Sequence, residues 1–395
     1  MSYGTDRVAE VDGGFDPFDK DDLEPGVRRV LERRAARKRG APPYRPRAEA
    51  PVEEALARFL ATAAPDARIE GLKRLGGGAS KEQFSFHIAA GHPQAGRYVL
   101  RMEPLQSISE SDRRREFEVL RAFGEIVPAP VPVWLDAEGE VLGQPAAIMK
   151  FVGGVTKPSE NVGGVTGLGT ILGDRLRPLI APQFIDCLAR IHGYDWEGKG
   201  LDSFEAPTGD PRRAALWQLN WWSQVWREDR TQSFPVMALA ERWMRRNLPA
   251  ADDIVLVHGD YRTGNYLFDE ADGRITALLD WELCHLGDFH EDIAWMLQRL
   301  FGSVEHDRQL AAGLLERGEM IAAYEAASGR KIDRRTLHFY EVFSAYKCIV
   351  ITMATGVKAA RDRHNHQEVL LTWLAPIGHI FAAELADLLK QEPGL

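Results

Sequence analysis

The sequence contains little cysteine, with only three widely separated residues of this type, Cys187, Cys284 and Cys348. No Cys-x-x-Cys pair is present, so neither a zinc ribbon nor a disulfide framework is predicted. The chain also lacks an apolar run of the ~20 residues that a membrane helix needs, and the nearest candidate, 369–383, contains Pro376 and His379. Its first residues have no hydrophobic segment of a signal peptide. We therefore expect no membrane span and a location in the reducing cytoplasm.

Length and composition are those of an ordinary globular protein. The chain has 395 residues, of which 45% are hydrophobic and 27% charged. At roughly 100–200 residues per domain, this length predicts two domains or one large bilobal unit. Such a chain can bury a substantial core without a disulfide or a metal. Composition therefore excludes a disordered or collagen-like protein.

Charge is unevenly distributed along the chain, whose net charge is −9. Residues 1–24 carry eight acidic and two basic side chains, whereas residues 25–47 carry nine basic and one acidic side chain. The remaining body is strongly acidic, which disfavours nucleic acid as a partner because phosphate contacts dominate that affinity. An acidic body is compatible with a cationic or neutral substrate, or with a phosphate delivered together with Mg²⁺.

The basic stretch near the N-terminus is predicted to be one short helix. It spans 27–39, with Pro25 before it and Gly40 after it, the usual helix start and stop signals. A Pro-rich linker follows. We interpret residues 1–50 as a solvated extension, with a docking arm for an acidic surface or anionic lipid as the alternative.

Hydrophobic periodicity divides the rest of the chain into two parts. A helix at 52–63 precedes strands at 69–75, 82–89, 97–102, 131–135 and 145–152. A helix at 109–123, with Ser109 as its cap, interrupts these strands. Beyond residue 180 the pattern is mainly helical (290–301, 306–327, 333–359 and 366–390), except for short strands within 254–281. The fold class is therefore α+β: a small antiparallel sheet at 51–152 and a large helical part at 153–395.

The strongest chemical pattern is the segment HGDYRTGN at 258–265, directly after the strand IVLV. Fifteen residues past Asn265 come Asp280, Trp281 and Glu282, at the end of the strand ITALLD. A loop after a strand can present Asp260 and Asn265 into one cleft, and a hairpin can return Asp280 beside them. Carboxylate and amide oxygens suit Mg²⁺, and a separate aspartate can deprotonate a hydroxyl.

These motifs resemble the aminoglycoside phosphotransferase and choline kinase-like family, the small-molecule branch of the protein-kinase fold. HGDYRTGN is similar to its HGDxxxxN catalytic loop, LLDWE to its DWE segment, and GDFHEDIAW to the helix start that follows. The resemblance covers about residues 55–390. It implies a bilobal protein-kinase-like fold, with ATP and Mg²⁺ as cofactors, Asp260 as catalytic base, and Asn265 and Asp280 as metal ligands.

The resemblance also locates the nucleotide-binding residues. The turn between the first two strands, where the family has its phosphate loop, contains Gly76, Gly77, Gly78 and Ser80; a plain hairpin turn is the alternative. Where kinases have a lysine on the third strand, this chain has Arg101, with Glu116 as its helix partner. A surface arginine is the alternative there. Backbone groups of Met149 and Phe151, in the segment between the lobes, are expected to meet adenine.

Arg262 stands two residues past Asp260, where many protein kinases have a lysine beside the transferred phosphate. We predict that it is catalytic and stabilises the charge that develops during transfer; an ion pair with a local acid is the alternative. Asp292 is expected to support the catalytic loop from the next helix. The tryptophans at 217–226 are interpreted as core packing, and the Gly-rich stretch 158–173 as a linker or lid.

The predicted function is transfer of the γ-phosphate of ATP to a hydroxyl of a small molecule. A catalytically weak, nucleotide-binding relative of such kinases is the alternative, because Arg101 replaces the usual lysine. A protein kinase or a purely interacting protein explains the motifs less well. The acidic body would suit an aminoglycoside or amino alcohol. Segments such as VLGQPAAIMKFVGG instead resemble phosphotransferase modules found with acyl-CoA dehydrogenases, which implies a hydroxyacyl acceptor.

Overall fold

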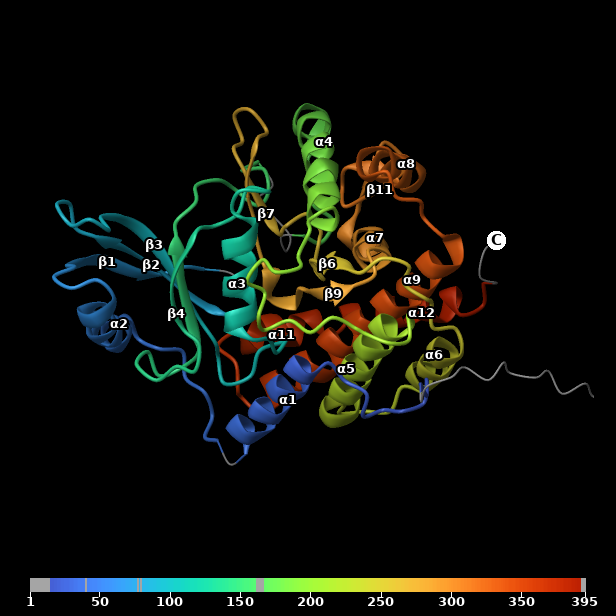
Figure 1. Cartoon of the computed structure of the whole chain (residues 1–395), viewed down its shortest axis with the longest axis horizontal. Coiled ribbons are helices and arrows are strands. Elements are labelled where there is room, and N and C mark those ends of the chain that lie inside the picture. The colour runs from blue at the N-terminus through green and yellow to red at the C-terminus, as the bar shows by residue number, and fades with distance from the viewer. Residues whose placement is uncertain (1–14, 40, 77, 79, 161–166, 392–395) are drawn as a thin grey trace, which may run out of the picture.

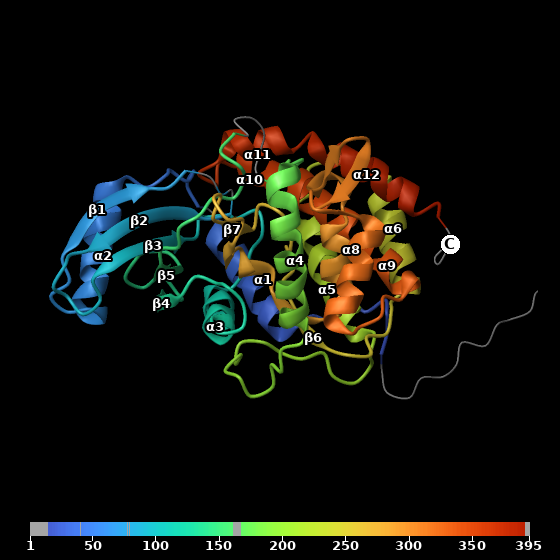
Figure 2. The ribbon, with the colours of Figure 1, turned by 90° about the horizontal axis from the view of Figure 1, so that it is seen from above.

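A five-stranded antiparallel sheet forms one of two lobes, and helices dominate the other (Figures 1 and 2). The computed structural model describes residues 15–39, 41–76, 78, 80–160 and 167–391. The strand order is β1-β2-β3-β5-β4, with bounds Ile69–Arg74, Glu82–Ile88, Gly96–Met102, Ala146–Lys150 and Pro132–Asp136. Each of these strands lies within two residues of a predicted one.

Strand alternation separates the two faces of this sheet. On β3, Tyr98 and Leu100 face a small core shared with helix α2 (Glu49–Ala63). The residues between them, Val99 and Arg101, line the opposite face, which borders the cleft between the lobes. Because side chains alternate along β3, Arg101 therefore points to the cleft side of the sheet.

Helix α3 (Arg113–Phe123) packs on the cleft side of the sheet, next to the helical lobe. The predicted cap, Ser109, is wrong: the N-cap is Asp112, whose side chain accepts the N–H of Arg114. Ser109 instead donates its hydroxyl to Glu282 at 2.6 Å. The Ser109 side chain therefore faces the cleft rather than the helix end.

The helical lobe is built around one large core. Its main helices are α4 (Gly173–His192), α5 (Arg213–Asp229), α6 (Pro235–Arg246), α7 (His290–Met296), α8 (Arg317–Ser328) and α9 (Arg334–Ile349). Three of the four tryptophans in 217–226 are buried on α5, and Trp217 is half-buried. The interpretation of these tryptophans as core packing is confirmed.

The segment from 254 to 287 forms two small two-stranded antiparallel sheets. Strand β6 (Val255–Val257) pairs with β9 (His285–Gly287), and β7 (Tyr266–Phe268) pairs with β8 (Ile275–Leu278). These pairs bring the ends of β6 and β8 to the same side of the lobe, where the loops 258–265 and 279–284 face the sheet lobe.

The C-terminal half departs from the predicted helices in three places. Residues 303–316 form a three-stranded sheet, β10 (Ser303–Glu305), β11 (Arg308–Ala311) and β12 (Leu315–Glu316), because turn residues His306 and Asp307 have left-handed backbone angles. The helix α9 continues through a π-helix, η3 (Val350–Gly356), into α10 (Val357–Arg361). Pro376 separates α11 (Glu368–Leu374) from α12 (Ile377–Leu388).

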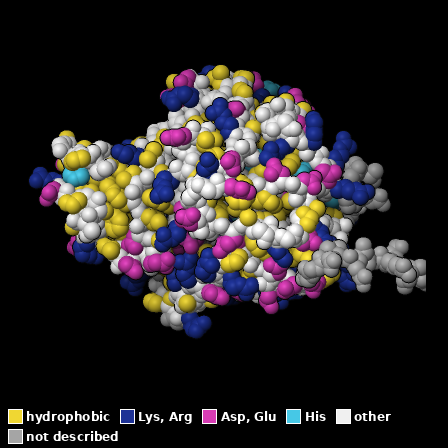
Figure 3. Space-filling model, in the orientation of Figure 1, with side chains coloured by type: hydrophobic (Ala, Val, Ile, Leu, Met, Phe, Trp, Pro, Cys, Tyr) yellow, Lys and Arg dark blue, Asp and Glu magenta, His cyan; other side chains and the backbone are white. Residues whose placement is uncertain are grey.

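The N-terminal helix α1 (Pro25–Lys38) is packed, so the prediction of a solvated extension is wrong for this segment. Val27, Val30 and Leu31 are buried, and Figure 1 shows α1 at the lower edge of the molecule, next to α5 and below α3. Its arginines lie among acidic side chains of both lobes, which Figure 3 shows as mixed blue and magenta below the centre of the molecule. The basic charge of α1 is therefore matched by its own protein.

Two helical stretches among the described residues are long and apolar enough to cross a membrane, Arg334–Arg361 and Glu368–Leu388. Most of the first is buried in the helical lobe, with 83% of its most apolar window inside the structure. Only 22% of the corresponding window of the second is buried. This is weak support for a span, because core helices have the same length and composition.

Candidate active site

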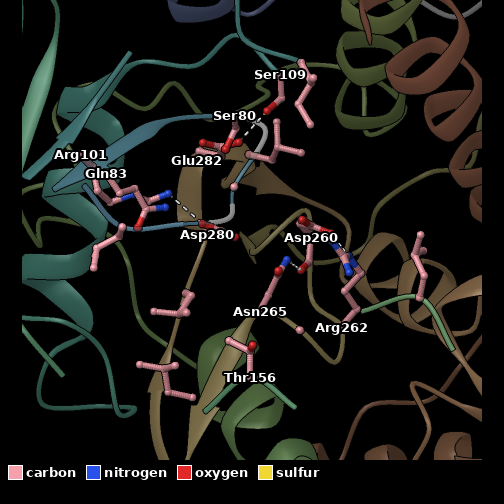
Figure 4. A pocket seen from close by; sticks show the side chains of 18 of the residues that line it. Ser80, Gln83, Arg101, Ser109, Thr156, Asp260, Arg262, Asn265, Asp280 and Glu282 are labelled. Carbon is pink, nitrogen blue, oxygen red and sulfur yellow. Dashed lines mark hydrogen bonds and ion pairs between the residues drawn. The ribbon is translucent and has the colours of Figure 1, made fainter. Parts of the chain in front are cut away.

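A cleft of about 670 Å³ runs between the two lobes and contains nearly all the predicted site residues. From the sheet lobe it is lined by Gly76, Gly78, Ser80, Arg101, Met149 and Phe151, and from the helical lobe by Asp260, Arg262, Asn265 and Asp280 (Figure 4). Glu116 lies behind the cleft wall and is fully buried. Gly77 lies outside the described residues.

The loop that carries Asp260 is fixed by its own backbone. Gly259 has φ of +80°, and a Cβ there would come within 2.5 Å of the carbonyl oxygen of Leu283, so the position requires glycine. The two carboxylate oxygens of Asp292, on α7, accept the backbone N–H groups of His258 (2.7 Å) and Gly259 (2.9 Å). Asp292 therefore supports the loop that carries Asp260, as predicted.

Buried charges stabilise that support. Burial alone would raise the pKa of Asp292, but the hydrogen bond from His192 and the loop N–H groups hold it below its ordinary value. Lys347, which sequence reasoning missed, donates to the carbonyl of Gly259 at 2.8 Å and lies 3.3 Å from Glu291. The loop is thus held by an ionised carboxylate on one side and an ammonium group on the other.

His258 joins the catalytic loop to the end of β8. Its Nδ1 accepts the N–H of Asp260 at 3.3 Å, so its Nε2 carries the proton and donates to the carbonyl of Leu279 at 3.0 Å. Burial lowers the pKa of His258, which favours this neutral form. The histidine is therefore a structural link between Asp260 and the segment before Asp280.

One carboxylate oxygen of Asp260 receives two side-chain donors. Nε of Arg262 lies 2.8 Å from Oδ1, and Nε1 of Trp295 lies 2.7 Å from the same atom. Within the part of the chain that the structure describes, Oδ2 has no side-chain donor. The carboxylate is thus held in one orientation with its second oxygen available to the cleft (Figure 4). Trp295, on α7, was missed, although it follows Asp292 by one helical turn.

Arg262 forms the ion pair that was the alternative prediction for it. Besides Asp260 it contacts the carbonyl of Gly167 at 3.2 Å, and its guanidinium lies 4.9 Å from the centre of the Phe301 ring. It lines the cleft and is 19% exposed at its side chain. The side chain therefore positions Asp260 and also offers charge to the cleft.

Asn265 and Asp280 lie on neighbouring strand ends, as the motif spacing predicts. The amide nitrogen of Asn265 donates to the backbone carbonyl of Asp260 at 2.8 Å, so its amide oxygen is the atom left for a ligand. The backbone of Leu279 donates to the backbone carbonyl of Asn265 at 2.7 Å, which brings Asp280 alongside. Asp280 has a left-handed backbone with φ of 58°, a strained conformation common at functional sites.

The donor set fits Mg²⁺ bound together with a nucleotide. Among the described residues there is no group of three or more His, Cys, Asp and Glu side chains that would hold a metal alone. Mg²⁺ keeps several waters and is usually held by one or two side chains plus substrate phosphates. The carboxylate of Asp280 and the amide oxygen of Asn265 match that requirement.

Arg101 joins the sheet to the helical lobe. Its Nη1 lies 2.6 Å from Oε1 of Glu116, and its Nη2 lies 2.8 Å from Oδ1 of Asp280 (Figure 4). Burial opposes the charged guanidinium, but Glu116 and Asp280 raise its pKa above the ordinary value. The predicted pair of Arg101 and Glu116 is therefore present, and the planar fork of arginine allows a second partner that a lysine would reach less well.

A second cation, Lys81, is buried beside the glycine turn and was missed. Its Nζ lies 3.4 Å from Glu282 and 3.8 Å from Glu103. Burial opposes ionisation of Glu282, but Lys81 and then Arg113 lower its pKa to about 2. The glutamate of the DWE segment, Glu282, is therefore an ionised anchor for the wall of the cleft.

The segment between the lobes has only some of its backbone groups free for the predicted contact with adenine. Met149 and Phe151 both line the cleft. The N–H of Phe151, however, already donates to the carbonyl of Arg97 at 3.0 Å, so it belongs to the sheet. Its ring packs under the Arg97 guanidinium, 3.7 Å from the ring centre.

The far end of the cleft has mainly apolar walls, which sequence reasoning did not locate. They come from the loops near 108 and 168, from α7, and from the C-terminal helices, and comprise Ile108, Leu168, Trp295, Phe301, Ile351, Leu370, Leu374, Ile377 and Phe381. The π-helix η3 contributes Ile351 and Thr352, in line with the frequent placement of π-helical turns at functional sites. This end of the cleft suits a ligand with an apolar body.

Comparison with known families identifies the class of protein. The model of the phosphotransferase enzyme family matches residues 71–330. The match spans more than half of the chain, and the chain therefore belongs to the phosphotransferase enzyme family.

Solved structures agree with this assignment at the level of the fold. A putative aminoglycoside phosphotransferase from Ralstonia eutropha is 22% identical with a TM-score of 0.62, covering 86% of this chain and 98% of that one. A thermostable mutant of aminoglycoside phosphotransferase APH(4)-Ia, in a complex with AMP-PNP and hygromycin B, is 16% identical with a TM-score of 0.54, covering 86% and 99%. The kinase-like fold with a sheet lobe and a helical lobe is thus confirmed.

The curated relatives are longer proteins of one group. Probable acyl-CoA dehydrogenase IBR3 of Arabidopsis thaliana is 29% identical over 318 residues, which is 72% of this chain and 36% of the relative. Acyl-CoA dehydrogenase family member 11 of Rattus norvegicus is 30% identical over 286 residues, 70% of this chain and 35% of the relative. This chain spans about a third of the length of these relatives. Family and fold together support a small-molecule phosphotransferase.

Proposed function

We propose that the protein transfers the γ-phosphate of ATP, bound with Mg²⁺, to a hydroxyl group of a small molecule. The observation that carries this proposal is the position of Asp260. Its Oδ1 is fixed by Arg262 and Trp295, its Oδ2 has no side-chain donor among the described residues, and the residue lines a cleft that also contains Asn265 and Asp280. A fixed carboxylate with one available oxygen can accept a proton from a bound hydroxyl.

Each side chain has a separate task in the proposed transfer. Mg²⁺ would neutralise charge on the phosphates, held by Asp280 and Asn265. Arg101, held by Glu116, would pair with the same phosphates. The proton leaves the acceptor hydroxyl for Oδ2 of Asp260 while the acceptor oxygen bonds to the γ-phosphorus and the bond to the leaving ADP oxygen breaks. Arg262, beside the base, would attract the negative charge on the transferred group.

The walls of the cleft favour an acceptor with an apolar body over a polycationic one. Besides Asp280, the carboxylates that line the cleft are Asp260 and Glu282, and large apolar side chains make up much of the remaining lining. Glu282 is already paired with Lys81 and Ser109. An aminoglycoside, with several ammonium groups, would find few partners there. We therefore propose a hydroxyacyl compound as acceptor, in keeping with the acyl-CoA dehydrogenase names of the curated relatives.

A panel of acceptors tests this proposal directly. The chain is incubated with Mg·ATP and a hydroxyacyl-CoA, a free hydroxy fatty acid, an amino alcohol or kanamycin, and ADP formation and the phosphorylated product are measured. We expect transfer to a hydroxyacyl compound, and transfer slower by about 10²- to 10⁴-fold in the variant Asp260→Asn. Nucleotide binding with no transfer to any acceptor would instead favour a weak nucleotide-binding relative, for which Arg101 in the place of lysine is the supporting observation.

A further inference from the structure

The helix α1 lies outside the residues matched by the family model, yet it is attached to the cleft-side helix of the sheet lobe. Nη2 of Arg33 lies 2.6 Å from Oδ2 of Asp112, the N-cap of α3. The other oxygen of Asp112 accepts the N–H of Arg114, which begins the helix. The first turn of α3 is thus bound to α1 on one side and to its own backbone on the other.

One turn along α1, Arg37 enters a buried chain of charges. Its Nη1 lies 2.9 Å from Glu103 and its Nη2 lies 2.8 Å from Glu110. Glu103 in turn lies 3.3 Å from Nε of Arg113, and Arg113 pairs with Glu116. Glu103, Arg113 and Glu116 are each no more than 2% exposed. The chain of ion pairs therefore runs from α1 to the carboxylate that holds Arg101.

The acidic and basic side chains in this series of ion pairs share their partners, so each carboxylate competes with others for the same cation. Glu103 has three cationic neighbours, Arg37, Lys81 and Arg113, whereas Arg113 is shared among Glu103, Glu116 and Glu282. In a low-dielectric interior, loss of one cation strengthens the pull of Glu103 on the others. Without the charge of Arg37, Arg113 would be drawn toward Glu103, and the Glu116 carboxylate would lose part of the ion pair that orients it toward Arg101.

We propose that Arg37 and Arg33 of α1 are positioning residues for the nucleotide site, because they fix α3 and thereby the orientation in which Glu116 presents Arg101. This inference rests on the proposed function, since it concerns the residue assigned there to the phosphates. According to this inference, helix α1 contributes to the function of the phosphotransferase domain and is not a separate N-terminal extension.

The attachment of α1 itself does not depend on these two arginines. Val27 and Leu31 belong to the main core, and Arg34, which is 2% exposed, pairs with Asp229 of α5. A variant of Arg33 or Arg37 therefore keeps α1 docked on the helical lobe while loosening its hold on α3. A matched control is Arg29 on the same helix, which is 58% exposed at its side chain and pairs with Glu205 at 3.1 Å.

The experiment compares Arg37→Ala, Arg33→Ala and Arg29→Ala with the wild type. Melting temperature, the Kd of AMP-PNP with Mg²⁺, and kcat/KM for ATP are measured for each. Coupling through such networks changes affinities by about 2-fold to 30-fold. We expect about a 10-fold loss in both nucleotide parameters for Arg37→Ala, a smaller loss for Arg33→Ala, and wild-type values for Arg29→Ala. Arg37→Lys, which restores the charge, should recover part of the loss.

A second comparison separates positioning from stability. In a Glu116→Gln background the chain is already broken, so Arg37→Ala should cost much less than it does in the wild type. If Arg37→Ala and Arg33→Ala lower only the melting temperature and match Arg29→Ala in both nucleotide parameters, the inference is wrong. If Arg37→Ala does not fold, the same comparison with Arg33→Ala, whose partners are partly exposed, decides it. A wild-type chain that neither binds AMP-PNP nor transfers phosphate would instead overturn the proposed function, and this inference with it.

Discussion

Nη2 of Arg101 lies 2.8 Å from Oδ1 of Asp280, so the residue proposed to hold the phosphates is paired with the residue proposed to hold the metal. Withdrawal from water raises the pKa of Asp280, and nearby Glu282 and Asp260 act in the same sense, while Arg101 opposes them. A cation bound with the nucleotide would take over the role of Arg101 at this carboxylate and release the guanidinium to the phosphates. In the proposed function, metal binding and phosphate binding would therefore be linked through one ion pair.

This link predicts the behaviour of Asp280→Ala. Because the carboxylate is proposed to bind the ion, the variant should lose affinity for Mg·AMP-PNP by at least about 10-fold, and much less affinity for metal-free AMP-PNP. Calorimetric titration with and without Mg²⁺ measures both. An equal loss in the two titrations would point to a general disturbance of the cleft instead of a lost metal ligand.

The pair of Arg101 and Glu116 predicts non-additive losses. Either Arg101→Ala or Glu116→Ala should lower kcat/KM for ATP, because the guanidinium is either absent or no longer held. The double variant should cost clearly less than the two single losses combined, as expected for residues in direct contact. Strict additivity across the cycle would count against their acting as a unit.

The base assignment predicts a selective loss of turnover. Asp260→Asn keeps the shape of the side chain and a donor-acceptor contact, so Mg·AMP-PNP affinity should change little. Turnover should fall by about 10²- to 10⁴-fold, the usual scale for loss of a general base. Single-turnover kinetics, which isolate the chemical step, provide the measurement, and a near-normal rate would exclude Asp260 as the base.

Stability in acid should depend on Glu282. Its folded pKa of about 2 lies below that of an unfolded glutamate, about 4.3. Its contribution to stability is therefore fully present above about pH 4.3 and is lost as the pH falls toward 2. Urea unfolding of the wild type and Glu282→Gln between pH 7 and pH 3 should give a free-energy difference that is constant down to about pH 5 and then shrinks. A difference that grows in acid would contradict the assigned ion pairs.

Much of this architecture was predictable because its signals are local. Alternating apolar residues placed the five strands, and the spacing from Asp260 to Asn265 and Asp280 placed the motif residues around one cleft. Residues 306–316 were predicted as helix because their periodicity is ambiguous, and the left-handed turn at His306 and Asp307 leaves no strong sequence signal. The π-helix η3 is likewise a product of packing rather than of composition.

The missed residues share a different cause. Lys81, Lys347 and Trp295 act through partners that are far away in sequence, such as Glu282, Gly259 and Asp260. A buried lysine looks like a surface lysine in a sequence, since only the tertiary fold supplies its carboxylate. The docking of α1 was missed for the same reason: its basic residues suggest a solvated helix until the acidic residues of both lobes are brought beside them.

Trp295 provides the sharpest test of how Asp260 is held. Its indole N–H lies 2.7 Å from Oδ1 of Asp260, and Trp295→Phe removes that donor while retaining most of the apolar ring. A hydrogen bond to a charged group contributes about 1.5–3 kcal/mol, so a loss of about 10-fold in the single-turnover rate is expected. KM for ATP should change little, because the nucleotide residues are untouched.

The control for Trp295→Phe is Trp217→Phe, because Nε1 of Trp217 lies 2.6 Å from Oδ1 of Asp22, outside the cleft. Both variants remove an indole donor from a carboxylate, so both should lower the melting temperature to a similar extent. Only Trp295→Phe should slow the chemical step, since only its partner is the proposed base. If both variants keep the wild-type single-turnover rate, Trp295 merely packs against the loop, and the orientation of Asp260 is set by Arg262 alone.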